Sequence, residues 1–434
     1  MFKRCLRVGL VNQPWGYVEP PVTRGGSIPI LLYEMAKRLA ATDCDVTYFT
    51  RGSFSRHFKH DPAGIRFEYI PVAVDKALIR VQSKVRLFHQ STPRPFWSSD
   101  WFHPQFGRGL GMVSHELNCD IVHIVNYTQF IPAVRRHNPS AKIVMHMHCE
   151  WANQLDHALI EPRLREADLI LGCSSYITRR IQEAFPQFAD RCKPLWNGVF
   201  TDRFTPGDRG AKRGDNGSQQ RIIFVGRVAP EKGVHILIEA FAKVVAAHPN
   251  LHLDIIGPDE IIPLDQQVTI CDDPEVRRLA PFYAPGAYRA HLNKLVESHG
   301  LANRVSFLGA VAHSDGLVDL YRRADVAVIP SIWDEPFGIP VVEAMATGAV
   351  PIVTRVGAFP EMVEDGESGL IINRNDPDAL AVAIRGLIEN DRIRRDLSRA
   401  ARRRATEHFG WDAQVDQLRG YYDELMAGEA VAAA

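Results

Sequence analysis

Short apolar runs alternate along the chain with longer segments in which apolar residues recur at helical spacing. In the second half, the run RIIFV at 221–225 leads into the segment 233–245, where Leu237, Phe241 and Val244 fall on one helical face. The alternation continues through LHLDIIG, HLNKLVESHGL, RVSFLG, GLVDLYRRA, DVAVIPS and AVPIVT. Continuous apolar runs are typical of strands buried on both faces, so the pattern predicts an α/β domain with a doubly wound parallel sheet.

The first half shows the same alternation. Its segments are LRVGLVN, the helical IPILLYEMAKRLA, DVTYFT, DIVHIV, AKIVMHMH and ADLILGCS. Between the halves, Thr205 to Gln220 reads TPGDRGAKRGDNGSQQ, which lacks apolar periodicity as a linker does. We therefore expect two Rossmann-like domains, at 1–204 and 221–410, that face each other across an interdomain cleft.

The composition fits this division. A chain of 434 residues that is 46% hydrophobic and 24% charged is too long for one core. Its seven cysteines include no CxxC pair, which argues against a disulfide framework or a cysteine-based zinc site. No apolar run reaches the roughly 18 residues of a membrane helix, and the start, MFKRCLRVGL, lacks the apolar core of a signal peptide. These features predict a soluble, cytoplasmic protein.

The net charge of zero hides an uneven distribution. Residues 1–210 hold 27 Lys and Arg against 19 Asp and Glu, a formal charge of +8, which leaves −8 for residues 211–434. A basic first half suits an anionic ligand, an acidic acceptor or an anionic membrane face. Solvation of the surface explains a charge of this size equally well.

Ligands of such sheets bind beyond the carboxyl ends of the strands, so the loops there are the first candidates. The loop VTRGGSIP carries Gly25 and Gly26 before a helix, where backbone N–H groups can approach a phosphate. The loop VGRVAPEKG contains Gly226, Arg227 and Lys232, and two cations beside free amides can neutralise a diphosphate. A simple glycine turn and a solvated charged loop are the alternatives.

A third loop places two acids around a helix start. In DEPFGIPVVEAMATG, Glu335 precedes the helix and Glu343 lies about one turn inside it. Carboxylates there can accept hydrogen bonds from a polyol, while the amides hold a charged part of the same ligand. Acids at a helix start also favour the helix dipole, but this does not explain Glu335 inside so constrained a turn.

Other motifs are less specific. His146 and His148 fall on one side of a strand, but four metal ligands are not evident, so we expect a packed or hydroxyl-facing pair and no metal. An Asp-x-Asp metal motif is also absent near the expected cleft. The segment GRGLGM at 107–112 has the spacing GxGxG, so it does not favour a nicotinamide oxidoreductase.

The stretch from Glu335 to Glu343, with AMATGAVPIVTRVGAFPEMVEDGESGLII after it, resembles the E-x7-E motif of glycosyltransferase family 4, retaining enzymes of the GT-B fold. Further segments are similar to that family and follow its order: the GG loop, HMHCEW, CSSYITRRI, NGVFTDRFTP, GRVAPEKG, RVSFLGAV and FGWDAQVDQLRGYYDEL. The resemblance covers nearly the whole chain and is strongest from Trp196 onward. The pairing of HIVN with IVMHMH also resembles spore-coat-type members.

The resemblance implies roles for the charged residues. Arg227 and Lys232 match the pair that binds the donor diphosphate and stabilises the departing nucleotide. Glu335 matches the acid that faces the transferred sugar, and Glu343 the acid that holds the ribose hydroxyls. His148 ends a strand where the family often has a histidine near the donor sugar.

The resemblance also implies backbone contacts and a final helix. The implied backbone groups are Gly25, Gly26 and Gly226 at the phosphates, Phe337, Gly338 and Ile339 at the sugar, and Leu308, Gly309 and Val311 beside the base. A terminal helix at about 411–428 is expected to cross back onto the first domain.

The implied activity is retaining transfer of a hexose from a nucleotide diphosphate sugar to a hydroxyl acceptor, without a metal or another cofactor. A UDP-sugar is favoured, and GDP- or ADP-sugars are possible. The acceptor is a saccharide, a lipid-linked molecule or a small molecule, with no nucleic acid partner and with peripheral contact to the inner membrane face left open. The alternatives are a non-catalytic GT-B scaffold, a sugar-nucleotide epimerase and a phosphorylase.

Two segments depart from the family. Residues 258–290 replace a direct strand-to-helix connection and either cover the donor or decorate the surface. Residues 83–112 are rich in aromatic side chains, which either line an acceptor groove, touch a membrane face or form a core under a long loop. These side chains are Phe88, Trp97, Trp101, Phe102 and Phe106.

Overall fold

The computed structural model describes residues 5–14, 16–22, 26–85, 94–207, 219–264, 270–312 and 315–432. The chain divides into two compact units. Unit 1 comprises Met1–Gly198 with Asp412–Ala434, and unit 2 comprises Val199–Trp411.

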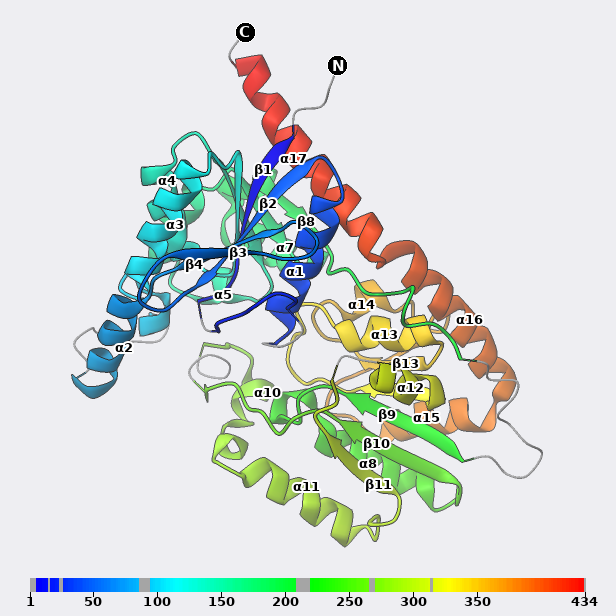
Figure 1. Ribbon diagram of the computed structural model, residues 1–434. Coiled ribbons are helices and arrows are strands. Elements are labelled where there is room, and N and C mark those ends of the chain that lie inside the picture. Colours follow the sequence, from blue (N-terminus) through cyan, green and yellow to red (C-terminus); the bar gives the residue numbers. More distant parts are fainter. Residues whose placement is uncertain are drawn as a thin grey trace. The chain divides into compact units, whose positions relative to one another are not determined.

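Unit 1 is built on an eight-stranded sheet in the order β3-β4-β2-β1-β5-β6-β7-β8. Figure 1 labels β1, β2, β3, β4 and β8 of this sheet. All paired strands run parallel except β3, which pairs antiparallel with β4 at the edge. The strands are β1 (Leu6–Val11), β2 (Cys44–Arg51), β3 (His57–His60), β4 (Arg66–Ile70), β5 (Ile121–Val125), β6 (Lys142–Met147), β7 (Leu169–Gly172) and β8 (Cys192–Pro194).

Helices connect these strands. They are α1 (Ser27–Ala40), α2 (Ala73–Val85), α3 (Pro104–Glu116), α4 (Ile131–His137), α5 (Trp151–Gln154), α6 (His157–Arg165) and α7 (Ser175–Ala184), with short 3₁₀ turns η1 (Phe96–Ser98), η2 (Thr128–Phe130) and η3 (Pro186–Arg191). The central strands are buried on both faces: all five residues of β5 are buried. This explains why the strands appear in the sequence as continuous apolar runs.

Unit 2 has a six-stranded parallel sheet in the order β11-β10-β9-β12-β13-β14. Its strands are β9 (Gln220–Val225), β10 (Leu251–Ile256), β11 (Val305–Gly309), β12 (Val326–Ile329), β13 (Val350–Thr354) and β14 (Leu370–Ile372). Its helices are α8 (Val234–Val245), α10 (Pro274–Arg277), α11 (Ala287–Ser298), α12 (Asp315–Arg323), α13 (Ile339–Thr347), α14 (Phe359–Met362), α15 (Pro377–Glu389) and α16 (Asp391–His408), with 3₁₀ turns η4 (Pro230–Lys232) and η5 (Ala280–Tyr283).

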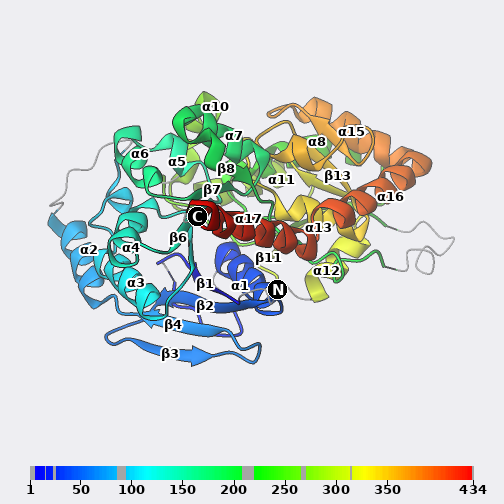
Figure 2. The ribbon, with the colours of Figure 1, turned by 90° about the horizontal axis from the view of Figure 1, so that it is seen from above.

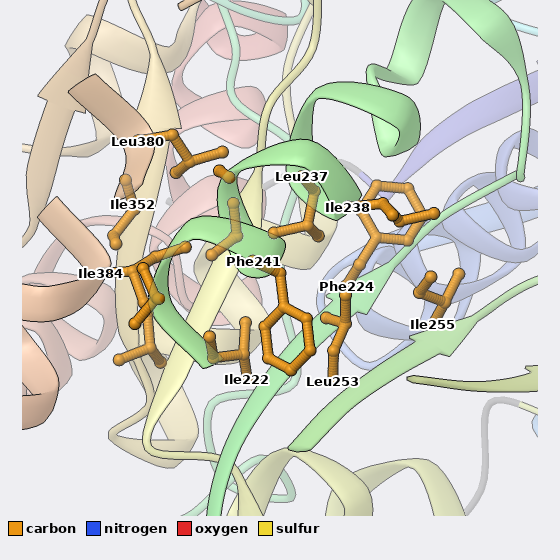
Figure 3. Packing of buried hydrophobic residues seen from close by; sticks show 14 of the residues in the cluster. Ile222, Phe224, Leu237, Ile238, Phe241, Leu253, Ile255, Ile352, Leu380 and Ile384 are labelled. Carbon is orange, nitrogen blue, oxygen red and sulfur yellow. The ribbon is translucent and has the colours of Figure 1, made fainter. Parts of the chain in front are cut away.

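The core of unit 2 forms where α8 covers the sheet. Leu237, Phe241 and Val244, the helical face predicted from the sequence, are fully buried there. Figure 3 shows how this face packs on the strands through Ile222, Phe224, Leu237, Ile238, Phe241, Leu253 and Ile255. Burial of each such side chain stabilises the fold by about 1.5–3 kcal/mol.

The last helix, α17 (Trp411–Ala432), completes unit 1, and both ribbon views place it beside α1 (Figures 1 and 2). Leu418 and Tyr422 are fully buried, and the Tyr422 hydroxyl lies 2.7 Å from His123 Nδ1 on β5. Arg38 on α1 forms an ion pair with Asp412 at 3.5 Å.

The first unit ends earlier than the sequence suggested. The sequence predicts that residues 199–204 belong to the first domain, but they group with unit 2. The reason is a set of contacts from α16, where Arg402 donates hydrogen bonds of 2.7 Å to the carbonyl oxygens of Thr201 and Phe204. Residues 208–218 of the expected linker 205–220 lie outside the described residues.

Three of the aromatic residues between 83 and 112 are core residues. Trp97, Phe102 and Phe106 are buried, whereas Trp101 is 54% exposed, and Phe88 lies outside the described residues. The segment GRGLGM lies in α3 and is not a loop. No helix in the described part of the chain combines the length and the apolarity needed to cross a bilayer.

Candidate functional site

The sheet order of unit 2 places its candidate residues at one point. Strand β9 is followed in the chain by β10 on one side of it, and the neighbouring strand β12 is followed by β13 on the other side. The carboxyl ends of β9 and β12 therefore form a topological switch point, where ligands of doubly wound sheets bind. The loop after β9 carries Arg227 and Lys232, and the loop after β12 carries Glu335. Residues more than 100 positions apart in the sequence are thus brought to one edge.

Close backbone contacts hold the two loops together. Gly233, which precedes α8, has a φ of 69°, and a Cβ atom there would lie 2.0 Å from the Pro330 carbonyl oxygen. The Ile332 N–H donates a hydrogen bond of 2.8 Å to the Glu231 carbonyl oxygen. Position 233 therefore requires glycine for both its conformation and its contact.

Lys232 and Glu335 form an ion pair at the switch point. The Lys232 Nζ atom lies 2.7 Å from Glu335 Oε1, and the Ser331 hydroxyl donates to the same oxygen. The other oxygen, Glu335 Oε2, accepts no hydrogen bond from a residue in the described ranges. Lys232 also lies over the Trp333 ring, 4.9 Å from its centroid. One cation and one carboxylate oxygen are therefore fixed, and the second oxygen is left to accept hydrogen bonds.

The backbone of Glu335 is fixed by the loop after β13. A Cβ atom at Gly357 would lie 2.3 Å from the Glu335 carbonyl oxygen, and this oxygen accepts a hydrogen bond of 2.9 Å from the Ala358 N–H. The Gly357 N–H donates to Asp334 Oδ1 at 2.8 Å. These contacts explain why an acid lies inside so constrained a turn.

Helix α13 begins beside Glu335 with free donors. Gly338 precedes it with a φ of 149°, and Phe337 is buried. The N–H groups of Phe337, Gly338 and Ile339 donate to no other described residue, as expected for the first turn of a helix. Amides that point out of a helix start favour oxygen ligands, and negative charge above all.

Arg227 lies on the other side of the β9 loop. Its Nη1 atom donates to the Glu260 carbonyl oxygen at 3.0 Å, and its Nη2 atom lies 2.7 Å from Glu231 Oε1. The Arg227 side chain is 22% exposed, whereas that of Glu231 is fully buried. Guanidinium has five N–H donors, so three remain for a ligand.

Glu343 is more enclosed than Glu335. It is 3% exposed, and its Oε2 atom accepts a hydrogen bond of 3.0 Å from the Tyr321 hydroxyl. Burial and the Glu343 carboxylate raise the pKa of Tyr321, so the hydroxyl remains a donor.

The residues expected beside the base end β11. Leu308 is 43% exposed, Gly309 has a φ of 67°, and the Gly309 carbonyl oxygen accepts a hydrogen bond of 2.8 Å from the Gly257 N–H at the end of β10. Val311 is half-buried just beyond the strand. A Cβ atom at Gly257 would lie 1.7 Å from the Gly226 carbonyl oxygen, so glycine allows the ends of β9 and β10 to approach.

In unit 1, the candidate residues follow strands β1 and β6. Gly26 directly precedes α1 with a φ of 91°, and Gly25 lies outside the described residues. His148 follows β6, and its N–H donates a hydrogen bond of 2.7 Å to Asn126 Oδ1, just beyond β5. Strands β1, β5 and β6 are neighbours in the sheet, so these residues share one edge.

His148 is half-buried and packs against two buried histidines, His123 and His146. The rings of His146 and His148 have centroids 4.1 Å apart, and His146 Nδ1 lies 3.1 Å from His123 Nε2. Burial lowers the pKa of His148 to about 4, although a hydrogen bond with Asn197 opposes this shift. Burial also lowers the pKa of His123, to about 3. Burial and the neighbouring His148 and His123 also lower the pKa of His146. The three rings are therefore neutral at pH 7.

The histidine cluster is not arranged as a metal site. Across the described ranges, no group of three or more His, Cys, Asp or Glu residues is placed to hold a metal ion. The cluster instead connects β5, β6 and the C-terminal helix through His123 and Tyr422.

Unit 1 also contains a cavity of about 530 Å³ between α3 and α4. Its walls include the aromatic side chains of Phe102 and Phe130, together with Arg108 and Arg136. Asp100, the acid in the lining, is already paired with Arg163. The lining therefore suits a hydroxylated or anionic small molecule.

Sequence patterns did not single out several residues that shape the unit 2 site. Ser331 and Trp333 lie in the loop before Glu335, and Glu231 lies between the two expected cations. Tyr283 donates to Glu231 Oε2 at 2.8 Å from a segment more than 50 residues away. The acid in PEKG was visible, but its burial follows only from the tertiary structure.

Comparison with known proteins assigns the chain to a family. Residues 28–203 match the model "Glycosyltransferase Family 4", and residues 209–404 match "Glycosyl transferases group 1". The chain belongs to glycosyltransferase family 4. The family expected from the E-x7-E motif is thereby confirmed, as is the enzyme class, a hexosyltransferase-type glycosyltransferase.

Two relatives of this glycosyltransferase match long stretches of the chain. Spore coat protein SA of Bacillus subtilis is 27% identical over 332 residues, 74% of this chain and 82% of its own. The D-inositol 3-phosphate glycosyltransferase of Geodermatophilus obscurus is 34% identical over 286 residues, 63% of this chain and 58% of its own. The chain thus spans little more than half of the latter relative.

A solved structure shows the fold. Anabaena Alr3699/HepE in complex with UDP-glucose superposes with a TM-score of 0.67 at 17% identity and covers 96% of this chain and 100% of its own. With the two parallel-sheet units, this likeness confirms the predicted GT-B fold.

Proposed function

We propose that the protein transfers a hexose from a nucleoside diphosphate sugar to a hydroxyl acceptor with retention of configuration. The observation that carries this proposal is the arrangement at the unit 2 switch point. There, Lys232, Glu335 and the free amides before α13 lie beside one another, with Arg227 on the same loop as Lys232. A diphosphate needs the cations, and a sugar needs the carboxylate oxygen and amides.

The cations support departure of the nucleotide. As the glycosidic bond breaks, negative charge accumulates on the diphosphate, and Arg227 and Lys232 are held in place before the reaction. Preorganised charge of this kind often contributes more to catalysis than any other effect, and the loss of one donor typically costs about 10²–10³ in kcat.

The Lys232–Glu335 pair implies an exchange when the donor binds. Lys232 Nζ is paired with the Glu335 carboxylate and lies over the Trp333 indole ring. A diphosphate carries more negative charge than one carboxylate, so we propose that Lys232 turns from Glu335 to the phosphate. Glu335 then accepts hydrogen bonds from the sugar hydroxyls, while Ser331 continues to hold its Oε1 atom.

The retaining course follows from the proposed entry of the acceptor on the side of the leaving group. A phosphate oxygen of the departing nucleotide takes the proton of the acceptor hydroxyl, so no protein base is required. His148 is neutral at pH 7 and follows β6 at the sheet edge that also carries Gly26, so we propose that its ring forms a hydrogen bond with the donor sugar.

The donor is proposed to carry UDP and to bind without a metal. HepE, which shares the fold, binds UDP-glucose. Because Arg227 and Lys232 both lie at the site, protein cations alone can neutralise the diphosphate charge. The acceptor is proposed to be a hydroxyl-bearing molecule, and the basic cavity of unit 1 suits one with acidic groups.

The deciding experiment is a binding and hydrolysis screen with UDP-, GDP- and ADP-sugars in the presence of EDTA. We expect one nucleotide to raise the melting temperature and its sugar to be slowly hydrolysed. The Arg227→Ala variant should be stabilised less by the nucleotide and should hydrolyse its sugar about 10²–10³ times more slowly. Arg395→Ala, at an exposed arginine of α16, should behave as the wild type does. A screen in which no nucleotide stabilises the wild type would favour a non-catalytic scaffold on the same fold.

A further inference from the structure

The insertion after β10 contacts the cation loop directly. The Pro258 carbonyl oxygen accepts a hydrogen bond of 2.9 Å from the Val228 N–H, and the Glu260 carbonyl oxygen accepts one of 3.0 Å from Arg227 Nη1. The insertion is anchored at its base by Asp259, which forms a bidentate ion pair with Arg289 on α11. The described part of 258–290 is therefore attached to the site and does not merely decorate the surface.

Tyr283, from the η5 turn of the insertion, reaches the same loop. Its hydroxyl donates to Glu231 Oε2 at 2.8 Å, while Glu231 Oε1 lies 2.7 Å from Arg227 Nη2. Glu231 is fully buried, so its charge is offset by these two contacts. Burial and Glu231 raise the pKa of Tyr283 well above its usual value, so the phenol remains a hydrogen-bond donor.

The insertion also reaches the loop that leads to Glu335. Asp273, which caps α10, pairs with Arg374, and Arg374 Nη1 donates to the Ile332 carbonyl oxygen at 2.8 Å. The Ile332 N–H is in turn bonded to the Glu231 carbonyl oxygen. Glu231 and Ile332 are thus bonded to each other, and Arg374, which is paired with the insertion through Asp273, also holds Ile332.

We propose that Tyr283 and the Glu260 carbonyl oxygen are positioning groups that aim the Arg227 guanidinium at the donor diphosphate. This inference rests on the proposed function of the site. Tyr283 acts through Glu231, which holds one edge of the guanidinium, and Glu260 holds a second N–H directly. The insertion thereby helps to fix the geometry of the diphosphate site.

Holding the guanidinium in advance lowers the cost of binding the donor. An arginine side chain has several rotatable bonds and loses rotamer freedom when it orders around a ligand. With two of its N–H groups held in advance, Arg227 presents the other three without that cost. The effect should therefore be seen in binding of the diphosphate and in the transition state, where the charge on the leaving group is greatest.

The test is a double-mutant cycle between Tyr283→Phe and Arg227→Ala in the full chain. Binding of UDP and the kcat and KM for the UDP-sugar are measured for the wild type, both single variants and the double variant. We expect Tyr283→Phe to lower kcat/KM about tenfold, the scale of one hydrogen bond to a charged group. In the Arg227→Ala background, Tyr283→Phe should have no further effect on kcat/KM, because Tyr283 influences donor binding only through the Arg227 guanidinium.

Two further variants serve as controls. Tyr33→Phe removes another tyrosine-to-carboxylate hydrogen bond, that of 2.7 Å to Asp61 in unit 1, and should leave kcat/KM unchanged. Glu231→Gln keeps the size of the side chain but removes its charge, and should reproduce the loss caused by Tyr283→Phe.

The outcomes separate the two proposals. If the wild type binds and transfers but Tyr283→Phe has no effect, or has an equal effect with and without Arg227, the positioning role is overturned and the proposed function stands. If the wild type binds no nucleotide sugar, the proposed function fails and the positioning role fails with it.

Discussion

At the scale of single residues, the cations of the unit 2 site are each paired with a carboxylate of the same site. Lys232 and Glu335 neutralise each other across 2.7 Å, with side chains that are 16% and 8% exposed. A pair this enclosed is costly to break on one side only, because the remaining charge stays buried. A ligand with its own negative charge can replace the carboxylate as the partner of Lys232.

Glu335→Gln tests that exchange. We expect the affinity for UDP to stay equal or to rise, because the carboxylate no longer competes for Lys232, while kcat for transfer falls by about 10² as the sugar loses a charged acceptor. Calorimetric titration with UDP and initial-rate kinetics measure the two effects. The control is Glu364→Gln, which removes a carboxylate paired with Arg404. Weaker UDP binding in Glu335→Gln would contradict the exchange.

The buried histidines of unit 1 predict acid sensitivity. The folded-state pKa values of His123 and His148 are lowered to about 3 and about 4, whereas the unfolded chain titrates near 6.5. Below about pH 6.5 the unfolded state therefore binds more protons than the folded state, so stability is lost as the pH falls towards 4. Each such histidine adds a slope of up to about 1.4 kcal/mol per pH unit.

The measurement is the melting temperature of unit 1 between pH 7.5 and 4.5. In His123→Gln the decline with falling pH should be shallower than in the wild type, because one buried base has been removed. His299→Gln, at an exposed position on unit 2, should leave the slope unchanged. Equal slopes in all three proteins would contradict the assignment.

At the scale of elements, glycines decide how closely the site loops approach. Gly233 lies against the Pro330 carbonyl oxygen and Gly357 against the Glu335 carbonyl oxygen. Each contact joins a loop after one strand to a loop after a neighbouring strand. The candidate site is therefore set by backbone packing as much as by its charged side chains.

Comparison of Gly357→Ala with Gly366→Ala should separate the effect of the contact with the Glu335 carbonyl oxygen from the effect of a positive φ. Gly357 has a φ of 49° and lacks room for a Cβ atom, whereas Gly366 has a φ of 77° and open space around it. Both substitutions strain the backbone by about 1–2 kcal/mol, but only Gly357→Ala should displace Glu335. We expect kcat to fall at least tenfold in Gly357→Ala and to stay near wild type in Gly366→Ala, as measured by initial rates beside melting curves.

At the scale of the whole molecule, the last segment of the chain belongs to the first unit. Residues from Asp412 onward group with Met1–Gly198, although Trp411, the first residue of α17, groups with unit 2. Val415, Leu418 and Tyr422 bury an apolar face there. The folding of unit 1 thus depends on residues that follow the whole of unit 2 in the sequence.

Leu418→Ala is expected to destabilise unit 1 selectively. Removing a fully buried leucine costs about 2–5 kcal/mol, and unit 2 keeps its own core. Scanning calorimetry should show one transition shifted down and the other unchanged. Gln417→Ala, at the exposed neighbouring position, is the control, and an equal shift of both transitions would contradict independent cores.

Much of the fold was predictable because local patterns carry it. All the strands and helices that the apolar runs predicted are present, from β1 to β13. The edge strand β3 was missed because its residues HFKH are exposed and have no apolar alternation. Helix α3 could not be predicted from the pattern, because three glycines and a proline interrupt its apolar spacing.

The sequence by itself determined the two α/β units, the family and the loops that carry Arg227, Lys232 and Glu335, because strand and helix periods and short motifs are local properties. Only the tertiary structure decided that Lys232 is paired with Glu335, that Glu231 is buried beneath Arg227, and that Tyr283 completes this contact. The Lys232–Glu335 pair joins residues 103 positions apart in the sequence, and the Glu231–Tyr283 pair joins residues 52 positions apart. Sheet order and loop packing, which no local pattern encodes, bring them together.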